Sequence, residues 1–356
     1  MLTARRLTVL SVSSLVVLAG SAPSVSGAEK VVGSATAGDL VINSSDLTVN
    51  LEFDPIAESV TGLGLTALWT AIVADKSDGI RPWSLDMSIS ATPPGGPTVL
   101  WDDPIGGDRT IADYPLADTS GPLFGSGVDL SAGGTLSFTI DSGNPSPWVI
   151  GLNDAVFHLT TTVPDESEVR EGIADSEEQW NRPFFIEGVS GLGPVSFDVI
   201  EFTVPVSGGY TFDSIVDSGN NFTYIYKDAF DPEQPLDNLL DYSLGNGFGP
   251  FGLPQGQSKI DALLLEDTTY FFVTSQWDRF TAAQPFTLTI TGPALIEDAG
   301  SACPGDATGD QVVDLADLNL VLANFGQTTT DGDVTDDGQV DLADLNAVLA
   351  NFGGSC

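Results

Sequence analysis

Basic residues are scarce in this chain. Its 356 residues include 11 Lys and Arg against 50 Asp and Glu, which gives a formal net charge of −39 at pH 7, and no basic residue follows Arg279. A protein that binds nucleic acid or an anionic membrane needs clustered cations to neutralise phosphate groups, so the sequence excludes both kinds of partner. The acidic residues are spread along the chain, which suits a protein that works in salt or divalent cations.

Histidine and the common catalytic motifs are also scarce. The only histidine, His158, lies in an alternating strand pattern, which is more typical of a surface or hydrogen-bonded residue than of a catalyst. The chain contains no Gly-x-Ser-x-Gly elbow, His-Glu-x-x-His pair or Walker loop, so triad, zinc and nucleotide chemistry lack their components. Glycoside hydrolysis needs only two carboxylates and is the enzyme class that stays open.

Long hydrophobic runs are missing too. No segment reaches about 18 uninterrupted apolar residues, the length that a transmembrane helix needs. The main apolar stretch, Leu7 to Ala19, follows Arg5 and Arg6 and precedes the small residues Ser26-Gly27-Ala28. This order is typical of a secretory signal peptide. We therefore expect a signal peptide at residues 1–28, a secreted, extracellular protein that is associated with the cell surface if its partner lies there, and no membrane insertion.

The residues between the signal peptide and the C-terminal region predict β-structure. Apolar and polar residues alternate at 46–53, 84–91, 134–140 and 156–162, and clusters of turn residues separate these segments. The charged stretch 164–184 breaks the pattern, and we interpret it as an acidic linker. The predicted fold class is mainly β, with two β-sandwich, jelly-roll-like domains at 29–163 and 185–293, a linker at 294–302 and a small all-α domain at 303–356.

The second β-domain contains a recognisable order of segments. Two strands joined at Ser207-Gly-Gly span residues 197–212, and the apolar segments 222–226, 230–236, 268–273 and 286–290 follow. This order resembles the bacterial pre-peptidase C-terminal family, a small β-sandwich that is appended to secreted enzymes and surface proteins. The resemblance covers residues 185–293 and implies an accessory, non-catalytic domain.

The last 54 residues contain one pattern twice, 27 residues apart. Each copy places oxygen-bearing side chains at positions 1, 3, 5, 9 and 12 of a twelve-residue loop, with a backbone carbonyl at position 7. This is how a loop wraps Ca²⁺, whereas Mg²⁺ prefers a small octahedral shell that keeps its waters. We therefore expect two Ca²⁺ ions, bound by Asp306, Thr308, Asp310, Val312, Asp314 and Asp317, and by Asp333, Thr335, Asp337, Gln339, Asp341 and Asp344.

After each loop the apolar period becomes that of a helix. Asp314 and Asp341 occupy N-cap positions, and Gly326 and Gly353 follow the last apolar residue as C-terminal caps. An unstructured acidic tail would have no reason to repeat these features in register. Two apolar stripes are expected to pack together, formed by Leu318, Val321, Leu322 and Phe325 and by Leu345, Val348, Leu349 and Phe352.

These duplicated loops and helices resemble the type I dockerin module over residues 303–356. In that family each calcium loop precedes a helix and ends in Asp rather than the Glu usual in EF-hands; here Gln311 replaces the Gly usual at position 6 of the first loop. The resemblance implies an EF-hand-like calcium domain that docks to a cohesin-like protein or another cell-surface component. Because its two halves are identical at the partner-facing positions, it also implies a dual binding mode, through Leu315, Ala316, Ala323 and Asn324 or through Leu342, Ala343, Ala350 and Asn351.

Cys303 and Cys356 are the only cysteines, and they bracket this repeat. We expect them to form a disulfide. Closing so long a loop is worth roughly 4 kcal/mol, which matters in a module too small to build a large core. Two unpaired thiols or a metal pair are the alternatives, although no third or fourth soft ligand lies nearby.

The first β-domain leaves two functions open. Exposed tryptophans stack on sugar rings, and we expect Trp101 to be exposed among Trp69, Trp83, Trp101 and Trp148, whereas core packing is the common role of tryptophan in a sandwich. The alternative is a polysaccharide-degrading enzyme with a carboxylate pair in residues 29–163, where Glu52 and Glu58 lie near a turn. Our main prediction is a secreted, non-catalytic protein that docks through its calcium module and presents its β-domains near polysaccharide or matrix.

Overall fold

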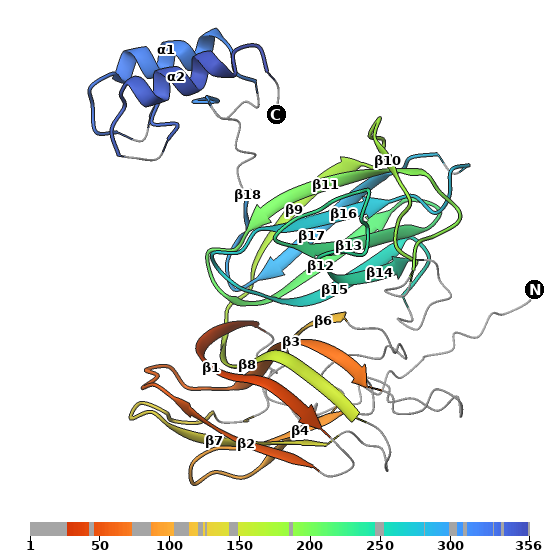
Figure 1. Cartoon of the computed structure of the whole chain (residues 1–356), viewed down its shortest axis with the longest axis vertical. Coiled ribbons are helices and arrows are strands. Elements are labelled where there is room, and N and C mark those ends of the chain that lie inside the picture. Colours follow the sequence, from red (N-terminus) through yellow and green to blue (C-terminus); the bar gives the residue numbers. More distant parts are fainter. Residues whose placement is uncertain are drawn as a thin grey trace, which may run out of the picture.

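A computed structural model describes most of the chain beyond the expected signal peptide. Over the residues that it describes, the protein is mainly β-structure, as predicted, with sandwich-like sheets formed by strands β1 to β18, and two helices, α1 and α2, near the C-terminus (Figure 1). No helix among the described residues is long and apolar enough to cross a bilayer. The described residues are 27–42, 46–72, 87–102, 114–119, 124, 127–141, 149–184, 188–245, 253–280, 282–298, 305–308, 312–329, 331–335 and 338–354.

The first sandwich packs two sheets against each other. One contains strands in the order β6-β3-β8-β1, and the other contains β2-β7-β4-β5. Alternation places Leu136, Phe138 and Ile140 of β7 in the core, where the Phe138 and Phe157 rings lie 4.4 Å apart. The strands are β1 (Ala28–Ile42), β2 (Leu47–Phe53), β3 (Gly62–Ile72), β4 (Ser88–Thr92), β5 (Val99–Asp102), β6 (Tyr114–Thr119), β7 (Gly134–Asp141) and β8 (Val149–Val163).

The second sandwich follows without an intervening linker. Strands β9, β17, β12 and β15 form one side, and β10, β11, β16, β13, β14 and β18 form the other. Phe202, Phe212 and Phe272 lie in the core between them. The strands are β9 (Glu166–Ile173), β10 (Gln179–Trp180), β11 (Val195–Thr203), β12 (Gly208–Val216), β13 (Asn221–Lys227), β14 (Leu239–Gly245), β15 (Gln257–Leu264), β16 (Tyr270–Ser275), β17 (Pro285–Gly292) and β18 (Glu297–Asp298).

The prediction of an acidic linker at residues 164–184 is wrong. Residues 166–173 form β9, which pairs along its whole length with β17, and residues 179–180 form β10, which pairs with β11. Charged residues are common on a strand at the edge of a sheet because they discourage pairing with other chains. The charge pattern of this segment was therefore that of an edge strand rather than of a linker.

The two sandwiches share one continuous sheet. Lys30 of β1 pairs with Gly208 of β12, and the Val31 N–H donates to the Ser207 carbonyl at 2.8 Å. A Cβ at position 208 would lie 2.2 Å from the Glu29 carbonyl oxygen, so only glycine permits this approach. Ala28, the last residue of the expected signal peptide, is the first residue of β1 and pairs with Val163 of β8.

Residues 197–212 were expected to form two strands joined at Ser207-Gly-Gly. The two strands are present as β11 and β12, but they do not pair with each other. β11 pairs with β16 and β18, and β12 pairs with β15 and β17 in the facing sheet. The turn crosses from one layer of the sandwich to the other. Both strands bury aromatic rings between the layers, with Phe202 and Phe212 5.4 Å apart.

The sheet that contains β13 is buried on both faces. Tyr224 and Tyr226 point away from the inner core into a second aromatic cluster, which Trp180 of β10 covers. The Trp180 ring lies 5.4 Å from the Tyr224 ring, and its Nε1 donates to the Ser275 hydroxyl at 3.1 Å. The segment that was expected to be a linker therefore supplies the cover for this face.

Helices α1 (Leu315–Asn324) and α2 (Leu342–Ala350) lie side by side (Figure 1). Each begins with a capping box: the Asp314 carboxylate accepts from the first turn of α1 while the Asp317 carboxylate accepts from the Asp314 N–H, and Asp341 and Asp344 repeat this in α2. Their shared core is small and consists of Val313, Val321, Val340 and Val348.

Candidate functional site: the duplicated C-terminal loops

A glycine directly before each loop contacts the helix of the other half. Gly305 has φ +104°, and a Cβ there would lie 2.6 Å from the Val348 Cα in α2. Gly332 has φ +89°, and its Cβ would lie 3.1 Å from the Val321 Cα in α1. The two halves therefore interlock, and neither loop start has room for a side chain.

Backbone hydrogen bonds also connect each half of the domain to the other. The Val313 N–H donates to the Gly354 carbonyl at 2.9 Å, and the Gly353 N–H donates back to Val313 at 2.7 Å. The Val340 N–H donates to Gln327 at 3.0 Å, and Gly326 donates to Val340 at 2.7 Å. Position 8 of each loop is thus joined to the chain that leaves the opposite helix.

The carboxylate at position 12 is the centre of the first loop. Asp317 is fully buried; its Oδ1 accepts from the Thr308 N–H and hydroxyl, both at 2.9 Å, and its Oδ2 accepts from the Asp314 N–H at 2.7 Å. Burial acts to raise the pKa of Asp317, but these hydrogen bonds outweigh it, so the pKa lies below its ordinary value. Positions 3, 9 and 12 are therefore drawn together around an ionised carboxylate.

The second loop repeats this geometry. The Asp344 Oδ1 accepts from the Thr335 hydroxyl at 2.9 Å and from the Thr335 N–H at 3.1 Å, and its Oδ2 accepts from the Asp341 N–H at 2.7 Å. Its pKa is also lowered, because the same kinds of hydrogen bond outweigh burial. In addition, the Gly338 N–H at position 6 donates to the Asp333 Oδ2 at position 1, at 2.8 Å, which closes the loop.

The donors at these loops are oxygen atoms alone, which suits a hard cation. In the first loop, Thr308 also lies 3.3 Å from the Asp306 Oδ1, so positions 1 and 3 are adjacent. Within the described residues, no group of three His, Cys, Asp or Glu side chains converges on one point. Asp310 and Asp337, the expected position-5 ligands, lie outside the described residues, as do Cys303 and Cys356.

The helices bury less of their apolar stripes than expected. Val321 and Val348 are buried, whereas Leu322, Phe325, Leu349 and Phe352 are between 46% and 54% exposed. The expectation that whole stripes pack together is wrong for these four residues, because a core of four valines accommodates one narrow face of each short helix. Each half leaves the same three apolar residues exposed, which we call its apolar ridge: Leu315 and Leu322 of α1 with Phe325 just after it, and Leu342 and Leu349 of α2 with Phe352 just after it.

Most of the expected partner-facing residues are on the surface. Leu315 and Leu342 are each 60% exposed, and the alanines at positions 316, 323, 343 and 350 are exposed as well. Asn324 and Asn351 are half-buried, and their side-chain amides donate to the carbonyls of Leu320 and Ala347 in their own helices. These asparagines therefore stabilise the helix ends.

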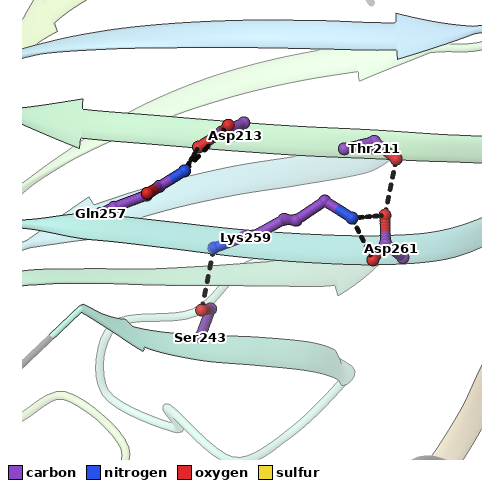
Figure 2. A network of polar contacts seen from close by, with 6 residues as sticks. All are labelled: Thr211, Asp213, Ser243, Gln257, Lys259 and Asp261. Atoms are coloured by element: carbon purple, nitrogen blue, oxygen red, sulfur yellow. Dashed lines mark hydrogen bonds and ion pairs between the residues drawn. The ribbon is translucent and has the colours of Figure 1, made fainter. Parts of the chain in front are cut away.

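The outer face of the second sandwich has a polar network (Figure 2). Gln257 of β15 donates to both Asp213 oxygens of β12, and Lys259 contacts both Asp261 oxygens at 2.7 and 2.6 Å. Thr211 also donates to Asp261, at 2.6 Å. Each carboxylate already accepts from neighbouring donors, an arrangement that stabilises a sheet surface rather than one that poises an acid for proton transfer.

In the first sandwich, the expected exposure of Trp101 is wrong, and a buried glutamate was not predicted. Trp101, expected to be exposed, is 4% exposed and belongs to the core; the side chains of Trp69, Trp83 and Trp148 lie outside the described residues. Sequence reasoning missed Glu29, whose buried carboxylate accepts from the Thr160 and Thr162 hydroxyls. Burial raises the pKa of Glu29, although these hydrogen bonds oppose the change.

His158 and the two glutamates near the predicted turn have ordinary structural roles. His158 is buried, and its two ring nitrogens contact the hydroxyls of Ser34 at 2.8 Å and Thr66 at 3.0 Å. Burial lowers its pKa to about 4. Glu52 is an exposed residue of β2, and Glu58 forms an ion pair with Lys30 at 3.6 Å.

No protein-family model and no curated protein sequence matches this chain. Among solved structures, it is similar to the N-terminal CBM22-1–CBM22-2 tandem domain of Xyn10C from Paenibacillus barcinonensis, with 11% identity and a TM-score of 0.23 over 76% of this chain and 99% of that one. It is also similar to the VP2 subviral particle of infectious bursal disease virus, with 12% identity and a TM-score of 0.16 over 75% and 73% of the two chains. At these TM-scores neither likeness carries an argument about function.

Proposed function

We propose that this is a secreted, modular, non-catalytic protein whose C-terminal domain, residues 303–356, binds two Ca²⁺ ions and docks it to a cohesin-like protein or another cell-surface component. The observation that carries the proposal is the equivalence of the two halves of this domain. Both place an ionised, buried carboxylate at position 12 against positions 3 and 9. Both also leave the same apolar ridge exposed. The sandwiches, the second of them resembling the pre-peptidase C-terminal family, are the cargo.

The oxygen donors support calcium as the bound ion. Each loop collects carboxylates and a hydroxyl without nitrogen or sulfur, and Ca²⁺ tolerates the irregular shell of six to eight oxygens that a twelve-residue loop provides. When bound, the ion would neutralise the carboxylates that otherwise repel one another. A disulfide between Cys303 and Cys356 would hold the ends of the domain together when both loops are empty.

The apolar ridges support docking by either half. Leucines that are 60% exposed at positions 315 and 342 raise the free energy of an isolated domain in water, and burial in an interface would recover it. Because the two ridges carry the same residues in the same order, a partner that fits one ridge also fits the other. The chain then binds in two orientations related by exchange of its halves.

Calorimetry of the full chain tests the calcium proposal. We expect binding of two Ca²⁺ ions, weaker binding of Mg²⁺, and an increase in the free energy of unfolding of about 2.7 kcal/mol per site, or about 5.4 kcal/mol for both, when free Ca²⁺ is 100 times the Kd of each site. The double variant Asp306→Asn, Asp333→Asn keeps an acceptor oxygen for the Gly338 N–H but removes both charges. Loss of Ca²⁺ binding in this variant is expected; stabilisation by Ca²⁺ equal to that of the wild type would refute the assignment of these loops.

Single and double substitutions test the docking face. Binding of the full chain to a panel of immobilised cohesin modules is measured in calcium. Leu315→Asp or Leu342→Asp alone should leave binding nearly unchanged, because the other ridge remains, and the two together should abolish it. Leu100→Asp, at a 58% exposed leucine of the first sandwich, is the matched control. A chain that binds no cohesin, or a double variant that binds as well as the wild type, would overturn the docking proposal.

A further inference from the structure

The start of β1 forms a separate segment of that strand. Residues 28–31 pair with residues 160–163 of β8, and the register of this pairing shifts directly after Val31. The hydrogen bond that joins the two sandwiches, from the Val31 N–H to the Ser207 carbonyl at 2.8 Å, also comes from this segment. Because a register shift interrupts the ladder, residues 28–31 can open while the rest of β1 stays paired. We call residues 28–31 the joining segment.

The joining segment contains a buried carboxylate. Glu29 is 7% exposed, and its two oxygens accept hydrogen bonds from the hydroxyls of Thr160 and Thr162 in β8. Among the residues that the structure describes, no Lys, Arg or His side chain forms an ion pair with it. Two neutral hydroxyls replace only part of the water that surrounds an exposed carboxylate, so ionising Glu29 in the closed segment is costly.

This cost couples the joining segment to pH. Burial raises the pKa of Glu29 above its ordinary value of 4.5, and the two hydroxyls oppose the change. A carboxyl group with a raised pKa stabilises the closed state below its ordinary pKa, and this contribution is lost as the pH rises through the raised value. Opening of the segment would return the carboxylate to water and remove the cost of ionisation. Acid therefore favours the closed segment, and higher pH favours opening.

The other ionisable groups around the joining segment are placed differently. Lys30 forms an ion pair with Glu58 at 3.6 Å, and both side chains are partly exposed. The strands and turns that contact the start of β1 also carry Glu52, Asp154, His158, Asp213 and Glu266. Over the described part of the chain, the raised pKa of Glu29 arises from burial and not from a neighbouring charge.

We propose that the joining segment is a pH-sensitive latch between the two sandwiches, which is closed while Glu29 is protonated and opens more often once Glu29 has lost its proton to water. Opening breaks the hydrogen bond from Val31 to Ser207, while the chain between β8 and β9 still connects the sandwiches. Their relative orientation is therefore less fixed at higher pH. The latch uses no residue of the C-terminal domain, so it is independent of calcium binding and of docking.

Hydrogen exchange of the full chain, at constant free Ca²⁺, tests the latch. The probe is the protection of the Val31 N–H relative to the amides of β7, which pairs with β2 and β4 in the first sandwich. After correction for the intrinsic pH dependence of exchange, this ratio should fall as the pH rises from 4.5, by about tenfold for each unit by which the pKa of Glu29 is raised. The chain must retain Ala28, because cleavage after it would place an α-ammonium group on Glu29 itself.

Three variants identify the titrating group. Glu29→Gln should remove the pH dependence and keep Val31 protected at higher pH. Thr160→Val removes a hydroxyl that favours the ionised carboxylate, so it should move the transition to higher pH. Glu58→Gln breaks the partly exposed ion pair of the same segment and is the matched control, which should keep the wild-type profile.

Four results would overturn the proposal. They are a wild-type ratio that does not change with pH, a pH dependence that persists in Glu29→Gln, a transition in Thr160→Val that does not move to higher pH, and a pH dependence that disappears in Glu58→Gln. If Glu29→Gln does not fold, the wild-type and Thr160→Val profiles still decide the case.

Discussion

Replacing Gly305 by alanine tests the interlocking of the two C-terminal halves. At φ +104° a non-glycine residue costs about 1–2 kcal/mol. The added methyl would also lie 2.6 Å from the Val348 Cα and 2.7 Å from the Ala347 carbonyl oxygen. Because both are backbone atoms of α2 they cannot rotate away, so overpacking adds about 1–3 kcal/mol. The expected loss in the free energy of unfolding of this domain is about 2–5 kcal/mol.

Substitutions at two other glycines distinguish the cost of backbone strain from the cost of a steric clash. Gly353 has φ +84° and open space around it, so Gly353→Ala should cost about 1–2 kcal/mol for strain alone. Gly332→Ala, whose Cβ would meet the Val321 Cα at 3.1 Å, should fall between the other two variants. Circular dichroism at 222 nm during urea unfolding, at fixed calcium, measures the effect, since α1 and α2 are the helices of the described residues. Equal losses for Gly305→Ala and Gly353→Ala would show that the loop start does not rest on α2.

Three further predictions concern single side chains. An unfolded histidine titrates near pH 6.5 but buried His158 only near 4, so His158 should contribute its full stability above pH 6.5 and lose up to about 3 kcal/mol as the pH falls from 6.5 to 4; a pH profile unchanged in His158→Gln would refute this. Arg182 is fully buried, and Arg182→Ala should lower the free energy of unfolding by roughly 3–5 kcal/mol, measured by tryptophan fluorescence in urea, because the Gln276 and Trp277 carbonyls lose their donor; a loss under about 1 kcal/mol would show that these hydrogen bonds contribute little. In chelator, Asp314→Ala should cost about 1 kcal/mol of helix stability and Asp314→Asn much less, because asparagine also caps helices; equal costs would argue against the cap.

The alternation of apolar residues predicted the strands well where one face is buried. β7 falls on its predicted segment because Leu136, Phe138 and Ile140 face the core while the residues between them are less buried, and β8 contains the predicted segment 156–162 with Phe157 in the core. The same rule failed for residues 164–184, where charged residues line an edge strand and a single tryptophan, Trp180, covers an aromatic face. Pairing across the sandwich joins residues that are far apart in the chain, and local pattern does not specify it.

At the candidate sites, the sequence predicted the features that are written twice in the chain but not how deeply each residue is buried. The capping boxes of Asp314 and Asp341 lie where the duplicated spacing predicted them. The apolar stripes were predicted to pack together, but how much of a stripe a domain can bury depends on the size of its core, which periodicity does not reveal.

The backbone join at Lys30 and Gly208 has a mechanical consequence. Two domains on a flexible tether sample many orientations, whereas two that share a sheet can turn relative to each other only by breaking hydrogen bonds such as that from Val31 to Ser207. We therefore expect the two sandwiches to move together, so that a force applied to one is transmitted to the other through the shared sheet. The relative orientation of the two sandwiches is therefore set by the fold and not by the length of a linker.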